Sequence, residues 1–173
     1  MMGPNMLANF SKVGYEKSFA ELYEHSPWVI ESVFETVKAD EKYNDINKFH
    51  ELLSETMLKA DKKLQDKLIK AHPMLAGKLA QNGELTDFST DEQASAGLNH
   101  CTQEEIALFD ELNKKYFEKF KFPYILAVKG KRKQEIIENF KERLNNDYET
   151  ERKTALDQIN KIAFIRIRGI YVN

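Results

Sequence analysis

The sequence is poor in the residues that cross-link a chain or break it into short pieces. Its 173 residues include one cysteine, Cys101, seven glycines and four prolines. A lone cysteine cannot form an internal disulfide, and it excludes a cysteine-rich metal site. We therefore expect a reducing compartment and long, seldom interrupted elements.

The chain also lacks a strong charge of either sign and any long apolar run. It has 26 basic and 28 acidic residues, and the charged runs at 129–133 and 151–153 are expected on solvated surface. No stretch approaches the ~20 apolar residues of a membrane span, and residues 1–9 lack the features of a secretory signal. These absences predict a cytoplasmic protein with neither nucleic-acid nor membrane partners.

Apolar residues recur every three or four positions between the few glycines and prolines, which predicts an all-α fold. We expect one compact domain over residues 1–173, a bundle of about eight to ten helices. Ser26 should cap a helix that has Pro27 in its first turn and runs through Val37. Residues 120–128 are aromatic and β-branched around Pro123, which favours an extended connector.

His72 stands at a predicted joint between two helices. The preceding helix should end near Ala71, because a residue before proline is disfavoured in the helical region, and Pro73 should begin another short helix. With an ordinary pKa of ~6.5, a histidine can act as an acid or a base near neutral pH. A histidine at a helix boundary is also common as a cap or surface residue, so both interpretations stay open.

A polar cluster lies at the next predicted helix start. Ser89 and Glu92 match a capping box, in which both side chains bind backbone N–H groups, and Gly97 should end that helix in a left-handed conformation. A helix N-terminus also attracts anions. Ser89, Glu92 and Gln93 therefore fit either a cap or a polar binding site.

The last predicted helix follows Asn145–Asp147, runs to about Arg168 and carries a second anomaly. At 100° per residue, Arg166 falls on the apolar face with Ala155 and Ile162, while Arg168 lies opposite. A buried guanidinium needs an acidic partner or an anionic ligand, and the sequence leaves that choice open.

Taken together, these blocks resemble the OHCU decarboxylases. Members of that family convert 2-oxo-4-hydroxy-4-carboxy-5-ureidoimidazoline (OHCU) to (S)-allantoin in urate degradation without a cofactor. The matching blocks, which span nearly the whole chain, are Glu24–Trp28, Ala71–Pro73, Leu75–Lys78, Ser89–Leu98, Phe122–Ile125 and Lys161–Arg166.

The resemblance implies a helical homodimer that acts on a small molecule and needs neither cofactor nor metal. It implies that His72 and Glu92 are catalytic. The substrate-binding positions that it implies are Pro73, Ser89, Gln93, Tyr124, Ile125 and Arg166. His72 and Arg166 would then have to converge on the helix start that carries Ser89.

Two other functions fit the same residues. The chain could be a helical interaction module, in which the histidine and the serine serve only as joint and cap. It could also be a related decarboxylase acting on another ureido or carboxylated ring compound. An optically active product would separate the enzyme from the module.

Overall fold

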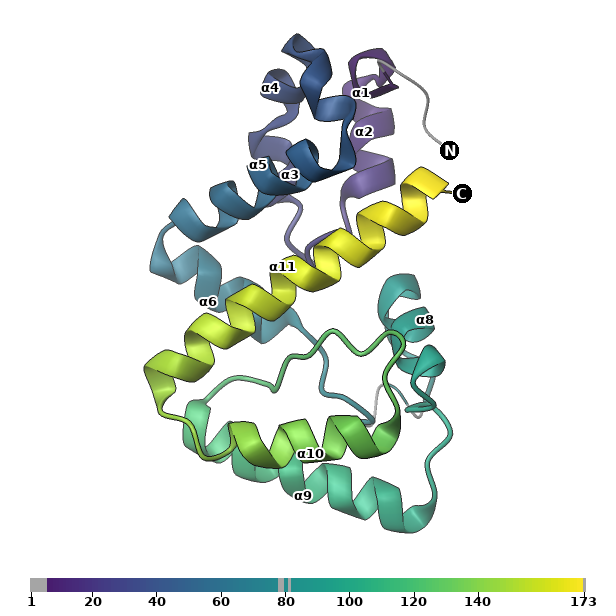
Figure 1. Ribbon diagram of the computed structural model, residues 1–173, viewed down its shortest axis with the longest axis vertical. Helices are drawn as coiled ribbons and strands as arrows, with labels where there is room; N and C mark the ends of the chain where they lie inside the picture. The colour runs from purple at the N-terminus through teal and green to yellow at the C-terminus, as the bar shows by residue number, and fades with distance from the viewer. Residues whose placement is uncertain (1–5, 78–79, 81, 173) are drawn as a thin grey trace. The chain divides into compact units, whose positions relative to one another are not determined.

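The computed structural model describes residues 6–77, 80 and 82–172 (Figure 1). The chain divides into two compact units, Met1–Ala71 with Asn160–Asn173, and His72–Ile159. All regular elements within the described residues are helices, which confirms the all-α class. None of the helices in this described part is long and apolar enough to cross a membrane. The assignment of residues 1–173 to one domain stays a prediction.

The first unit has a core built around aromatic rings. Phe19 lies edge-on to Tyr15 and to Phe49, with ring centroids 5.3 and 5.4 Å apart. Its elements are α1 (Met6–Asn9), α2 (Lys12–Phe19), α3 (Trp28–Ser32), α4 (Phe34–Ala39), the 3₁₀ helix η1 (Glu41–Asn44), α5 (Ile46–Lys59), α6 (Lys62–Ala71) and the end of α11 (Tyr148–Val172).

The helix predicted from Ser26 to Val37 is in fact two short helices. At Val33 the backbone has φ −106° and ψ 0°, and its N–H bonds to Ile30 three residues back, a tightened turn that ends α3. Ser26 is not the cap, because its hydroxyl donates to the Glu24 carbonyl at 2.9 Å. Pro27 occupies the N-cap position itself.

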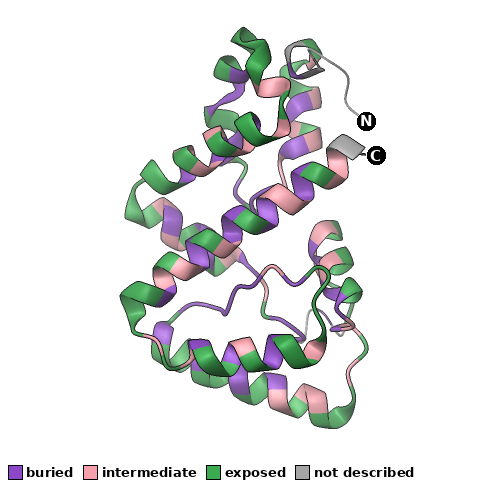
Figure 2. Cartoon of the chain, viewed as in Figure 1, coloured by how far each residue is buried: buried purple, intermediate pink, exposed green. Residues whose placement is uncertain are grey.

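The second unit contains α8 (Asp87–Ser95), α9 (Gln103–Phe120), α10 (Lys133–Arg143) and the first part of α11. Helices α9 and α10 lie side by side in Figure 1. Residues 121–128 between them are non-helical and 122–126 are buried, as Figure 2 shows, which confirms the extended connector.

A buried ion pair holds this connector in place. Arg143 Nε lies 2.8 Å from Glu151 Oε1, and Arg143 Nη1 donates to the Ile125 carbonyl at 2.5 Å. Tyr116 donates its hydroxyl to the same carboxylate at 2.5 Å, and burial together with Glu151 raises the pKa of Tyr116. The expectation that 151–153 is solvated is therefore wrong at Glu151, which is fully buried.

Candidate functional site

Helix α6 ends at Ala71 as predicted, and His72 follows in a non-helical loop over residues 72–77. The His72 side chain is buried, Pro73 is partly exposed and Met74 is exposed. The short helix expected to begin at Pro73 is absent from this loop. Its backbone follows another course, since Ala76 has a left-handed φ of +52° and its N–H bonds to a side chain.

Side-chain amides bind the backbone of this loop at three consecutive residues. Gln93 in α8 accepts from the Ala76 N–H at 2.9 Å and donates to the Met74 carbonyl at 3.4 Å. Asn113 in α9 donates to the Leu75 carbonyl at 3.0 Å. The loop that carries His72 is thus fastened to the helix that carries Ser89 and Glu92.

Helix α8 begins earlier than the capping-box prediction. Thr86 is the N-cap, and its hydroxyl oxygen accepts from the Ser89 N–H at 3.4 Å. The prediction that Ser89 and Glu92 cap the helix is therefore wrong: Ser89 lies inside the first turn, buried, and Glu92 is half-buried one turn later. Gly97, with φ +74°, follows the helix end in the left-handed conformation as predicted.

Tyr124 and Ile125 lie on the buried connector of the same unit. The Tyr124 ring stacks on Phe140 at 3.8 Å and lies 4.5 Å from the Arg143 guanidinium carbon, while its hydroxyl donates to Asn139. Burial raises the pKa of Tyr124. The aromatic side chain is thus used in packing, and the expectation that the backbone at Tyr124 and Ile125 lines the pocket stays a prediction.

Arg166 belongs to the first unit and is buried, whereas Arg168 is exposed, which confirms the predicted face of the helix. The Arg166 Nη2 lies 2.9 Å from the Glu24 carboxylate, and the Arg166 Nη1 donates to the Glu21 carbonyl at 2.7 Å. The acidic partner that the sequence left open is therefore Glu24, which sequence reasoning did not single out. The available signal was its place in the block Glu24–Trp28. The expected convergence of Arg166 with His72 stays a prediction.

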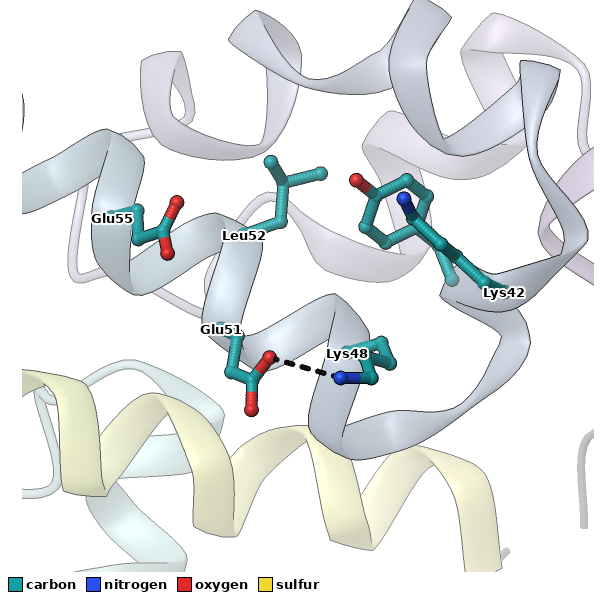
Figure 3. Close-up of a pocket in the computed structure, with 6 residues that line it drawn as sticks. Lys42, Lys48, Glu51, Leu52 and Glu55 are labelled. Atoms are coloured by element: carbon teal, nitrogen blue, oxygen red, sulfur yellow. Dashed lines mark ion pairs between the residues drawn. The ribbon is translucent and has the colours of Figure 1, made fainter.

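A separate hollow of about 200 Å³ lies on the first unit (Figure 3). Lys48 and Glu51, one turn apart on α5, form an exposed ion pair across 3.6 Å at its edge. It is lined by Lys42, Tyr43, Lys48, Glu51, Leu52 and Glu55. None of these residues was predicted to be functional, and exposed pairs of this kind are common on helix surfaces. Among the residues described, no three His, Cys, Asp or Glu side chains gather to hold a metal ion.

Comparison with known proteins gives one family. Residues 9–168 match the family model described as OHCU decarboxylase. The chain is 33% identical over 150 residues to the OHCU decarboxylase of Haloferax volcanii, covering 87% of this chain and 84% of that one. It is 37% identical over 171 residues to the uric acid degradation bifunctional protein of Bacillus sp. TB-90, covering 99% of this chain but only 32% of that protein.

Solved structures share the fold. An (S)-allantoin synthase aligns over 95% of this chain and 52% of its own, with a TM-score of 0.71 and 25% identity. An OHCU decarboxylase crystallised in the presence of (S)-allantoin aligns over 90% of this chain and 99% of its own, with a TM-score of 0.70. At 16% identity, that second likeness concerns the fold alone. Fold and sequence together define the class as an all-helical protein of a decarboxylase family. The chain belongs to the OHCU decarboxylase family.

Proposed function

We propose that this chain catalyses the cofactor-independent decarboxylation of OHCU to (S)-allantoin in urate degradation. The observation that carries the proposal is the fastening of the His72 loop to α8, which fixes a buried histidine relative to the helix bearing Ser89 and Glu92. Family membership supplies the substrate class, a small anionic ureido compound.

The substrate itself allows the reaction to proceed without a cofactor. The carboxylate is attached to a carbon that also bears a hydroxyl group, in a ring that can accept an electron pair. When the C–C bond breaks, carbon dioxide leaves and the electron pair stays on the ring as an enediolate-like intermediate. Protonation of one face of that intermediate then gives a single enantiomer of allantoin.

Each role is proposed for a residue that the family resemblance selects. His72 takes the hydroxyl proton to start C–C cleavage, as a general base with an ordinary pKa of ~6.5 can near neutral pH. Glu92 accepts from the ureido and ring N–H groups. The Ser89 hydroxyl and the second amide proton of Gln93 bind the polar groups of the substrate. Gln93 can supply this proton because an amide nitrogen carries two donors. Pro73 and the backbone at Tyr124 and Ile125 line the pocket.

Arg166 is the proposed partner of the substrate's negative charge. A guanidinium has five N–H donors in a rigid fork, so an arginine can bind an anion while it keeps other contacts. Glu24 and the Glu21 carbonyl fix the direction of that fork. In this proposal Glu24 orients Arg166.

The test is circular dichroism during coupled urate oxidation, because OHCU also decays spontaneously and only an enzyme yields optically active allantoin. We expect wild-type protein to produce (S)-allantoin faster than the spontaneous reaction. His72→Ala should lower kcat by about 10²–10⁴-fold, the usual contribution of a general acid or base, and should keep the helical spectrum. His100→Ala is the matched control, since His100 is exposed in the same unit.

Three results would contradict the proposal. A racemic product formed at the uncatalysed rate would favour the interaction module. Near-normal turnover by His72→Ala would remove this histidine from the mechanism. A different ureido or carboxylated ring compound turned over much faster than OHCU would favour the related-decarboxylase alternative.

The proposal also includes a homodimer in the cytoplasm. The dimer comes from the family resemblance, and the compartment from the lone cysteine and the sequence composition. Light scattering after size-exclusion chromatography measures the oligomeric state, and a mass near 20.2 kDa would show a monomer. Fractionation of the source cells tests the compartment.

A further inference from the structure

Asn113 is a buried polar residue on the apolar face of α9. The other buried residues of that helix are Phe109, Leu112, Tyr116 and Phe120, all apolar or aromatic, whereas Asn113 is only 5% exposed and carries two polar atoms. Its Nδ2 binds the Leu75 carbonyl, but its Oδ1 is buried and has no hydrogen-bond partner among the residues that the structure describes. An unsatisfied buried acceptor destabilises a fold, so packing does not account for this asparagine.

The side chain of Asn113 donates its hydrogen bond to Leu75, in the middle of the loop that carries His72. Gln93 binds the Met74 carbonyl and the Ala76 N–H on either side, so two adjacent peptide units, 74–75 and 75–76, are fixed by two side chains from two helices. The loop needs such support, because Ala76 has φ +52°, a conformation that is unfavourable for a residue with a Cβ. A Cβ at Gly77 would lie 3.2 Å from the Met74 Cβ, so the turn is also tight.

We infer that Asn113 is a positioning residue for His72: it holds the Leu75 carbonyl and so fixes the loop in the conformation that the reaction requires. This inference rests on the proposed function, in which His72 is the base. The 75–76 peptide is bound at both ends, because Gln93 in α8 holds the Ala76 N–H and Asn113 in α9 holds the Leu75 carbonyl. Loss of Asn113 therefore removes the bond that ties this peptide to α9. Small displacements of a catalytic group lower turnover strongly, by up to about 10²-fold for 1 Å.

The variant Asn113→Leu separates positioning from stability. Leucine is close in size, removes the unsatisfied Oδ1 and also removes the donor to Leu75. We expect a thermal midpoint close to that of the wild type, a kcat lowered about tenfold or more, and a KM for OHCU changed much less. Faster hydrogen exchange at the Ala76 amide should accompany the loss of kcat.

The variant Asn113→Asp adds a signature that a purely structural role would not produce. A protonated carboxyl can donate to the Leu75 carbonyl, whereas a carboxylate repels it. Burial raises the pKa of such a carboxyl, so the kcat of this variant relative to wild type should rise as the pH is lowered. The partial rescue reports the restored hydrogen bond.

Gln65→Leu is the matched control. Gln65 is another buried carboxamide, in the first unit, and donates to the Met57 and Leu58 carbonyls at 3.0 Å each. Its loss should lower the thermal midpoint without lowering kcat.

The outcomes distinguish the inference from the proposed function. If wild-type protein does not accelerate (S)-allantoin formation, both fail. If wild type and His72→Ala behave as proposed but folded Asn113→Leu keeps its kcat and its Ala76 exchange rate, the inference alone is overturned. An equal loss of kcat in Gln65→Leu would also overturn it.

Discussion

Removal of the Arg143 guanidinium should be among the most damaging single changes in the second unit. In Arg143→Met, the Glu151 carboxylate stays fully buried and keeps, among the described residues, its hydrogen bonds from the Tyr116 hydroxyl at 2.5 Å and the Asn146 amide at 3.0 Å. The Ile125 carbonyl loses a donor at 2.5 Å. One charge of a buried pair is then left without its counterion.

The expected loss is about 3–5 kcal/mol, the usual consequence of removing one partner of a buried ion pair. A domain of this size is stable by about 5–15 kcal/mol, so the change removes a large part of the free energy of unfolding. Each kcal/mol shifts the thermal midpoint by about 2–4 °C, which gives a decrease of about 6–20 °C. Urea unfolding followed by the helical circular dichroism signal measures the free energy directly.

A double variant tests the reasoning behind this number. If the loss comes from an uncompensated carboxylate, Arg143→Met combined with Glu151→Leu should recover much of it, since apolar replacements of a buried pair are often neutral. Arg132→Met is the matched surface control, because Arg132 is exposed and lies 4.0 Å from Glu135. An Arg143→Met protein as stable as this control would refute the expected loss of stability. A double variant less stable than Arg143→Met would refute the uncompensated carboxylate as its cause.

Two further predictions concern the first unit. Burial lowers the pKa of His50, whose Nε2 lies 2.8 Å from the Asn160 carbonyl, so its neutral form is favoured in the folded state. The contribution of His50 to the free energy of unfolding is complete above the unfolded pKa of ~6.5 and is lost as the pH falls from there towards the lower folded pKa. In urea titrations at several pH values, His50→Gln should flatten the fall of the free energy of unfolding below that pKa. An unchanged dependence on pH would exclude His50 as its source. Arg166→Met should both raise the KM for OHCU and destabilise the protein, because the buried Glu24 carboxylate loses the guanidinium that lies 2.9 Å away. Adding Glu24→Leu should restore the stability but not the KM, and restoration of both would make the arginine purely structural.

The sequence predicted the structure well at positions where a single local rule applied. Thr102 and Glu105 have the T-x-x-E spacing of a capping box and form one in the structure, with hydrogen bonds of 3.1 and 2.9 Å, and helix periodicity placed Arg166 inward. The OHCU decarboxylase family and the helical class were likewise recognisable from sequence blocks. These features depend on neighbours within a turn or two, which the sequence displays directly.

The failures came from contacts between distant residues, or from two neighbouring residues that both fit the same position. Pro73 fits a helix start, but Gln93 binds the Ala76 N–H seventeen positions away and favours a loop instead. Ser89 fits an N-cap, but Thr86 offers another hydroxyl one turn earlier and takes the position. Glu24 and Glu151 resemble surface acids, and only their tertiary partners Arg166 and Arg143 explain their burial.

Helix α11 has a consequence for the order of folding. Residues 160–172 complete the first unit, where Asn160 binds Tyr23 across 137 positions and Arg166 binds Glu21 across 145. The N-terminal 71 residues therefore leave the ribosome without the helix that completes their core and pairs the buried Glu24. The first unit is begun first and completed last, and a chain that stops before α11 is finished lacks the guanidinium that pairs with the buried Glu24.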